Sequence, residues 1–181
     1  MSDNSAYKNG RGAQINPHNR FFSQEKGDDF DDMDPLEEPE LKTKFIDVHP
    51  KSIVNKLSSP DIGMYYSLNP YQGCEHGCIY CYARPSHAWM GLSPGLDFES
   101  RIFFKPEAAR LLEQELAKPR YVCKRIHIGG NTDPYQPVER ELKSTRSILE
   151  VMRRFNHPFS IITKSVLIAR DADILGPMGQ A

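Results

Sequence analysis

The chain has 181 residues, a formal net charge of −1 and four cysteines. This length predicts one domain, or part of one, and the near-neutral charge gives no evidence for the strongly basic surface typical of nucleic-acid-binding proteins. The sequence contains no run of about 18 apolar residues and no apolar stretch near its start, so we expect neither a membrane span nor a secretory signal. Clustered cysteines suit a reducing compartment, and we therefore predict a cytoplasmic protein.

Residues 1–44 are predicted to form a disordered tail, and residues 45–181 the folded domain. The tail is rich in Asp, Glu, Asn, Gly and Lys, and it lacks the apolar surface that would offset the entropy of ordering. Residues 25–40 carry nine acidic residues against one lysine, which predicts a solvated spacer. Residues 11–22 mix arginine with aromatic side chains. They are either a floppy leader or a segment that docks on the domain or on a nucleic acid.

A short aromatic strand is predicted at residues 64–68, and a cysteine-rich loop follows it directly. Cys74, Cys78 and Cys81 have the spacing C-x3-C-x2-C. Thiolates this close together are soft ligands, which select iron–sulfur clusters, zinc or copper(I). Two glycines and a preceding proline argue against a helix here. The pattern therefore predicts a loop wrapped around a metal site.

Three interpretations of this loop remain open from the residues alone. A structural zinc site would need His76 or His87 as a fourth ligand, but the second pair of ligands that is usual in such sites is absent. A redox pair of Cys78 and Cys81 would leave Cys74 without a role. A [4Fe-4S] cluster with three protein ligands and one open iron would use all three thiols.

The remaining elements follow in chain order. Residues 45–57 are ambiguous, and residues 85–104 predict a long loop because prolines and glycines recur in them. The expected elements after that loop are a helix at 105–117, a strand at 121–128, a turn-rich loop at 129–137, a helix at 138–155, a strand at 159–163 and a helix beginning at 170.

This alternation predicts an α/β fold of about three βα units with parallel strands and right-handed crossovers. In such folds, functional loops gather at the carboxyl ends of the strands. The cysteine loop, the loop that starts at Gly129 and Gly130, and the polar residues around Lys164 each follow a predicted strand. We therefore expect these three loops to lie along one edge of the sheet.

The cysteine motif, with Tyr80 just before the third cysteine, resembles the signature of the radical S-adenosylmethionine (radical SAM) enzymes. The wider string Gly-Cys-x3-Cys-x-Tyr-Cys-Tyr-Ala-Arg resembles the branch of spore photoproduct lyase and the DNA repair photolyase-like proteins. The resemblance covers roughly residues 64–175, about half of the βα units usual in that fold. It implies a partial (β/α) radical-SAM-type barrel and a truncated N-terminal portion of a longer protein.

The resemblance implies a lyase-like enzyme in which Cys74, Cys78 and Cys81 hold a [4Fe-4S] cluster. S-adenosylmethionine would bind the open iron and be cleaved reductively to a 5′-deoxyadenosyl radical. Such an enzyme needs an electron donor, such as flavodoxin or ferredoxin, and a nucleic acid is the substrate suggested by the branch. The rival hypothesis is a non-enzymatic, zinc-binding interaction module or an inactive fragment.

The resemblance also implies roles for residues outside the cysteine triplet. The glycine-rich loop is expected to contact the cofactor through Gly129, Gly130, Asn131, Thr132 and Asp133. The alternative for this loop is a tight turn in which Asp133 caps a helix. Lys164 would meet the cofactor carboxylate or simply be solvated, and Tyr80 would shield the cluster or lie near the adenine. The extra cysteine that spore photoproduct lyase uses as a hydrogen donor has no counterpart, because Gly130 takes its place.

Overall fold

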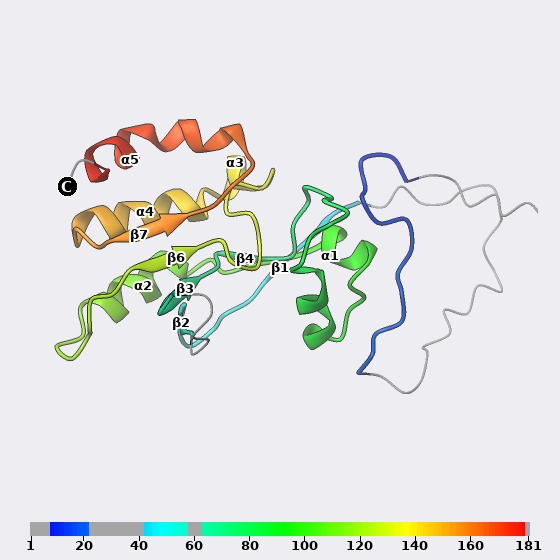
Figure 1. The fold of residues 1–181 in the computed structure, drawn as a ribbon, viewed down its shortest axis with the longest axis horizontal. Coiled ribbons are helices and arrows are strands. Elements are labelled where there is room, and N and C mark those ends of the chain that lie inside the picture. Colours follow the sequence, from blue (N-terminus) through cyan, green and yellow to red (C-terminus); the bar gives the residue numbers. More distant parts are fainter. Residues whose placement is uncertain (1–7, 22–41, 58–62, 180–181) are drawn as a thin grey trace, which may run out of the picture.

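The computed structural model describes residues 8–21, 42–57 and 63–179 (Figure 1). Its strands are β1 (Lys44–Asp47), β2 (Val54–Lys56), β3 (Tyr66–Leu68), β4 (Tyr71–Gln72), β5 (Arg101–Phe104), β6 (Ile126–Ile128) and β7 (Phe159–Ile161). Its α-helices are α1 (Leu96–Ser100), α2 (Ala108–Leu116), α3 (Glu139–Leu142), α4 (Ser144–Arg154) and α5 (Ala172–Met178). Two 3-10 helices, η2 (Arg84–Met90) and η3 (Val166–Asp171), complete the set. None of the helices among these residues is long and apolar enough to cross a membrane.

The larger sheet has the strand order β2-β3-β6-β7. Strands β3, β6 and β7 are parallel, with Leu68 opposite Ile128 and Ile128 opposite Ile161. Strand β2 is antiparallel to β3. The prediction of a mixed α/β fold with parallel strands is therefore confirmed, and these are the three strands expected from the alternation.

Helices α2, α4 and α5 cover one face of this sheet (Figure 1). The core between them includes Leu112 from α2, Met152 from α4 and Ile128 from β6, all fully buried. Because side chains alternate along a strand, the opposite face carries polar residues in one register, including Ser67 and His127. Packing of amphipathic helices on one face thus fixes which way the strands present their side chains.

A second, smaller sheet has the order β1-β5-β4, with β1 parallel and β4 antiparallel to β5. Strand β4 lies between β3 and the cysteine loop, so the loop does not follow β3 directly as we had expected. Tyr71 of β4 is fully buried beside Ile102 of β5 and Val138. This small core anchors the chain immediately before the cysteines.

The prediction of one long loop at residues 85–104 is wrong, because η2, α1 and β5 occupy most of it. The prolines and glycines that suggested a loop lie instead at the ends of these elements. Pro85 occupies the first turn of η2, and Gly91 ends η2 in the left-handed conformation with φ of 75°. Gly95 precedes α1 as its N-cap.

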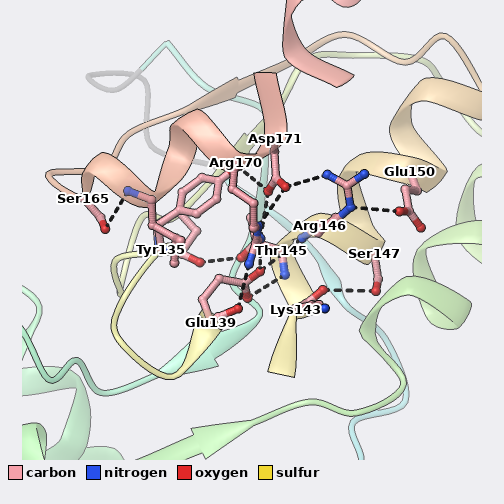
Figure 2. A network of polar contacts seen from close by, with 12 residues as sticks. Tyr135, Glu139, Lys143, Thr145, Arg146, Ser147, Glu150, Ser165, Arg170 and Asp171 are labelled. Atoms are coloured by element: carbon pink, nitrogen blue, oxygen red, sulfur yellow. Dashed lines mark hydrogen bonds and ion pairs between the residues drawn. The ribbon is translucent and has the colours of Figure 1, made fainter. Parts of the chain in front are cut away.

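The predicted helix at 138–155 is two helices, because Lys143 takes a left-handed conformation with φ of 51° between α3 and α4. The break lets the Glu139 carboxylate of α3 accept hydrogen bonds from Thr145 N (2.9 Å) and Arg146 N (3.3 Å) at the start of α4 (Figure 2). The expected strand at 121–128 is also shorter and contains only β6. The contacts of Glu139 with the start of α4 leave no signal in the local periodicity of the sequence.

Residues 8–21 lie against the folded region, which matches the docking alternative left open for residues 11–22. Asn19 is buried, and its side-chain amide donates to Ala88 O and Leu92 O, at 3.0 Å each. The acidic spacer predicted at 25–40 falls outside the described residues. The division into a tail and a domain at residue 44 stays a prediction, although β1 begins at Lys44.

Candidate cofactor pocket at the cysteine loop

A pocket of about 190 Å³ opens where the cysteine loop meets the loops that follow β6 and β7. These are the carboxyl ends of two parallel strands, where such folds place their functional loops. All the predicted site residues except Asn131 line it. The lining residues are Cys74, His76, Cys78, Tyr80, Cys81, Tyr82, Ala83, Gly129, Gly130, Thr132, Asp133, Ile162, Thr163 and Lys164. The roles of these residues stay predictions, but their convergence is a property of the fold.

The cysteine loop begins at Gly73, whose backbone requires glycine. Its φ is +86°, and a Cβ there would lie 2.9 Å from the ring of His87 and 3.0 Å from Phe98 O. The next residue, Cys74, donates its backbone N–H to Phe98 O at 2.9 Å. Burial raises the pKa of the Cys74 thiol to about 11. The free thiol is therefore protonated at neutral pH, and a metal must displace that proton to bind.

The thiol donors suit iron–sulfur chemistry. Cys74 is buried, whereas Cys78 and Cys81 are half-buried, and all three are free thiols that line the pocket. Within the part of the chain that the structure describes, no three His, Cys, Asp or Glu side chains converge tightly enough to chelate a single ion. Three soft thiol donors that line one pocket without converging on a single point suit a cluster held by one thiolate per iron.

The two histidines considered as zinc ligands lie in different surroundings. His76 lines the pocket, and its Nε2 is 3.5 Å from the Asp133 carboxylate. His87 is fully buried, shares a hydrogen bond with Arg101 O at 2.9 Å and packs against the Phe98 ring. Burial lowers the pKa of His87. Of these two histidines, only His76 lines the pocket together with the cysteines.

The glycine loop approaches the pocket with its backbone. Gly129 has φ of +94°, and a Cβ on it would lie 2.6 Å from Pro134 Cδ, so the turn requires glycine. The Tyr82 hydroxyl donates to Gly130 O and ties this loop to the cysteine loop. Thr132 is buried and donates its hydroxyl to Gly73 O at 2.7 Å. Asn131 is directed elsewhere: it is exposed, and its N–H donates to Asn69 Oδ1 at 2.8 Å.

Asp133 joins two of the pocket loops. One carboxylate oxygen accepts from Tyr135 N (2.9 Å) and from the Thr163 hydroxyl (2.6 Å). The other oxygen accepts from Lys164 N at 3.0 Å. These bonds resemble the capping turn that was the alternative for this residue, extended to a second loop. Its carboxylate therefore positions the loop after β7 relative to the loop after β6.

Lys164 brings a positive charge to the mouth of the pocket. Its ammonium group lies 2.8 Å from Cys78 Sγ and 3.1 Å from the Tyr80 hydroxyl, and these hydrogen bonds raise the pKa of Lys164. The Tyr80 side chain is 76% exposed and packs under the ammonium, 4.5 Å from it to the ring centroid. A cation in this place can attract an anionic group of a ligand beside the thiols.

Gln136, which the sequence analysis overlooked, brackets Cys74. It is fully buried; its Oε1 accepts from Glu75 N at 3.1 Å, and its Nε2 donates to Gly73 O at 3.3 Å. One side chain from the loop after β6 thus holds the peptide groups on both sides of a candidate ligand. The sequence signal for it was weak, because a glutamine in a turn-rich segment is usually solvated.

Replacing Gln136 with leucine is expected to lower the free energy of unfolding by about 2 kcal/mol, because buried groups such as Glu75 N lose their partner. Urea denaturation monitored by circular dichroism measures this change. The matched control is Gln114→Leu, since Gln114 is exposed on α2. If the urea midpoint of Gln136→Leu equals that of Gln114→Leu, the hydrogen bonds of the Gln136 side chain add nothing to stability.

Comparison with known proteins reveals one family. The sequence pattern of the Radical SAM superfamily matches residues 68–181. Among curated proteins, the uncharacterized protein Rv2578c of Mycobacterium tuberculosis (strain H37Rv) is 34% identical over 137 residues, which cover 75% of this chain and 40% of that protein. The uncharacterized protein MJ0683 of Methanocaldococcus jannaschii is 31% identical over 133 residues, 74% of this chain and 47% of that protein.

A viral protein is also similar: the uncharacterized protein ORF301 of Acidianus two-tailed virus is 30% identical over 117 residues, 61% of this chain and 37% of that protein. No solved structure was found to match. The chain spans 40% of the length of the mycobacterial relatives. None of these relatives has a name that states an activity.

Proposed function

The chain belongs to the radical SAM superfamily, and from this premise we propose that it binds a [4Fe-4S] cluster and S-adenosylmethionine in the pocket at the cysteine loop. The observation that carries the proposal is the convergence of three loops. The motif cysteines, the Gly129–Gly130 backbone and the Lys164 ammonium all line the same 190 Å³ pocket.

Each part of the pocket suits a part of this proposal. Cys74, Cys78 and Cys81 would hold the cluster, and the exposed Lys164 ammonium would pair with the carboxylate of S-adenosylmethionine. The glycine loop would present backbone groups to the same ligand, held in place by the Tyr82 hydroxyl. When bound, the reduced cluster and S-adenosylmethionine supply an electron and a 5′-deoxyadenosyl radical, which is the chemistry of the cofactors. The protein contributes binding, orientation and exclusion of water.

The finer features rest on resemblance and remain part of the proposal. We propose that β3, β6 and β7 belong to a (β/α) barrel of radical SAM type and that flavodoxin or ferredoxin donates the electron. A lyase-like reaction on a nucleic acid, as in the spore photoproduct lyase branch, is suggested by the wider motif alone. A cytoplasmic location fits the four free thiols of the described chain.

Reconstitution under anaerobic conditions tests the proposal. After incubation with iron and sulfide, the chain is expected to bind about four irons and four acid-labile sulfides. Dithionite and S-adenosylmethionine should then yield 5′-deoxyadenosine, measured by chromatography and mass spectrometry. The control omits dithionite. One bound zinc ion and no labile sulfide would contradict the proposal and favour a zinc-binding interaction module.

A further inference from the structure

The segment of residues 11–19, which we call the strap, precedes the region that matches the family, residues 68–181. It runs beside α1, where Figure 1 shows it in blue. Along its length, Pro17 O accepts from the Ser93 hydroxyl at 2.7 Å, and Ile15 O accepts from Leu96 N at 3.3 Å. Asn16 and Asp97 exchange a reciprocal pair of hydrogen bonds, at 2.9 and 3.0 Å. The strap is therefore attached to the fold by its backbone and its side chains.

A buried carboxylate connects the strap to the cysteine loop. Glu99 is fully buried, and its carboxylate accepts from Gly12 N (3.0 Å) and Ala13 N (2.9 Å) of the strap. The same carboxylate forms an ion pair with Arg84. Arg84 in turn donates to Cys78 O through Nε and Nη2, at 3.2 and 2.9 Å. A continuous set of hydrogen bonds thus runs from the strap to the backbone of a candidate cluster ligand.

The charge of Glu99 explains why the strap matters. A carboxylate withdrawn from water must be compensated by donors, and hydrogen bonds to ionised groups are stronger than neutral ones. Two of the donors to Glu99 are backbone N–H groups of the strap. If the strap moved away, water would enter beside Glu99, and its pairing with Arg84 would weaken. Arg84 would then hold Cys78 O less firmly.

The strap also touches the cysteine loop directly. A Cβ added to Gly12 would lie 1.8 Å from Gly77 O and 2.7 Å from Gly77 C. Gly77 lies between Cys74 and Cys78 and has φ of +61°. Because the obstructing atoms belong to the backbone, no side-chain rotation can relieve the overlap. Only glycine at position 12 allows the strap to lie against the loop.

We propose that the strap supports the cofactor site by holding the cysteine loop in the conformation in which its thiols face the pocket. In this role Gly12, Glu99 and Arg84 are positioning residues and do not contact the cofactor. The proposal rests on the proposed function in one respect only, namely that the thiols bind a cluster. Whether the strap holds the cysteine loop in place can be tested separately, in the metal-free protein.

The test is Gly12→Ala in the full chain, with Gly176→Ala as the matched control because a Cβ on Gly176 meets nothing within 4 Å. In the metal-free proteins, alkylation of Cys78 and Cys81 is measured by mass spectrometry relative to Cys123, which is exposed and serves as an internal reference. In Gly12→Ala, the alkylation rate of Cys78 and Cys81 relative to that of Cys123 is expected to rise about tenfold over the wild type. This is the factor that corresponds to loss of a hydrogen bond to a charged group. Gly176→Ala should match the wild type.

Asn19→Ala provides a second variant, since it loosens the far end of the strap without touching the cysteine loop. It should shift the alkylation ratio in the same direction by a smaller factor. After reconstitution, both strap variants should release iron to a chelator faster than the wild type. Unchanged alkylation ratios in both variants would overturn the strap proposal. Failure of the wild type to bind iron and sulfide would instead overturn the proposed function, and the alkylation ratios would still decide the role of the strap.

Discussion

Cys78→Ala is expected to abolish cluster binding, with iron and labile sulfide falling to background after reconstitution. The proposed site has only three protein ligands, so removal of one leaves two thiolates for a cluster that also keeps one iron open. The alanine variant keeps the Cys78 backbone carbonyl, which accepts from the Arg84 guanidinium, so the change removes only the thiol. Visible absorption and iron analysis measure the loss without depending on activity. Cys74→Ala and Cys81→Ala should behave in the same way.

The control for these variants is Cys123→Ala. Cys123 is exposed and does not line the pocket, so its loss should leave iron and sulfide at the wild-type level. Circular dichroism of each metal-free variant establishes that the fold persists. Full iron binding by Cys78→Ala, or equal loss in Cys123→Ala, would contradict the assignment of the motif cysteines as the ligands.

Periodicity in the sequence predicted the elements that pack on the main sheet. Leu112 and Leu116 in α2, and Ile148 and Met152 in α4, recur at helical spacing and are buried as that spacing indicates. The helix predicted at 138–155 was extended too far at its end. Phe155 falls beyond the end of α4 and is exposed, so the local pattern located the helices better than their ends.

The elements that were missed depend on distant partners. Strand β4 has only two residues, and it exists because Tyr71 and Gln72 pair with β5. The strap has no apolar pattern that would have predicted its order. It is held by hydrogen bonds to residues about 70 to 90 positions away, such as Ser93 and Glu99. Hydropathy carries no record of backbone hydrogen bonds made at such separations.

The sequence predicted those parts of the candidate site whose residues lie close together along the chain. The spacing of the three cysteines lies within eight residues and indicates a metal site directly. The contribution of Gln136 was invisible, because it depends on the loop after β6 folding over Gly73 and Glu75. Asp133 was expected to contact a cofactor or to cap a helix, and its hydrogen bonds show that it joins two loops. Residues that support a site are harder to find than residues that bind.

A buried polar network joins α3 and α4 to neighbouring elements (Figure 2). Glu139 lies at its centre and is fully buried; it accepts from Tyr71 OH and from Arg170 Nη2 at 2.7 Å. Asp171, also fully buried, accepts from the Tyr135 hydroxyl (2.9 Å) and from Arg146 (2.8 Å). Burial opposes ionisation of Asp171, but hydrogen bonds from Arg170 (2.9 Å) and Arg146 outweigh it and lower the pKa of Asp171. The network thus links β4, α3, α4 and η3.

Glu139→Ala is therefore expected to lower the free energy of unfolding by about 3–5 kcal/mol, the usual cost of removing one partner from a buried ion pair. The variant leaves Arg170 with Asp171 as its remaining carboxylate partner. It also removes the Glu139 acceptor from the Tyr71 hydroxyl and from the Thr145 and Arg146 N–H groups at the start of α4. Urea denaturation measures the change in the free energy of unfolding, provided that the dependence on denaturant is the same for both proteins.

Glu141→Ala, on the exposed side of α3, is the matched control and should change stability by less than about 0.5 kcal/mol. Equal stabilities of the two variants would contradict the central role of Glu139. Because Tyr71 lies two residues before Gly73, Glu139→Ala should also speed alkylation of Cys74, whereas Glu141→Ala should not.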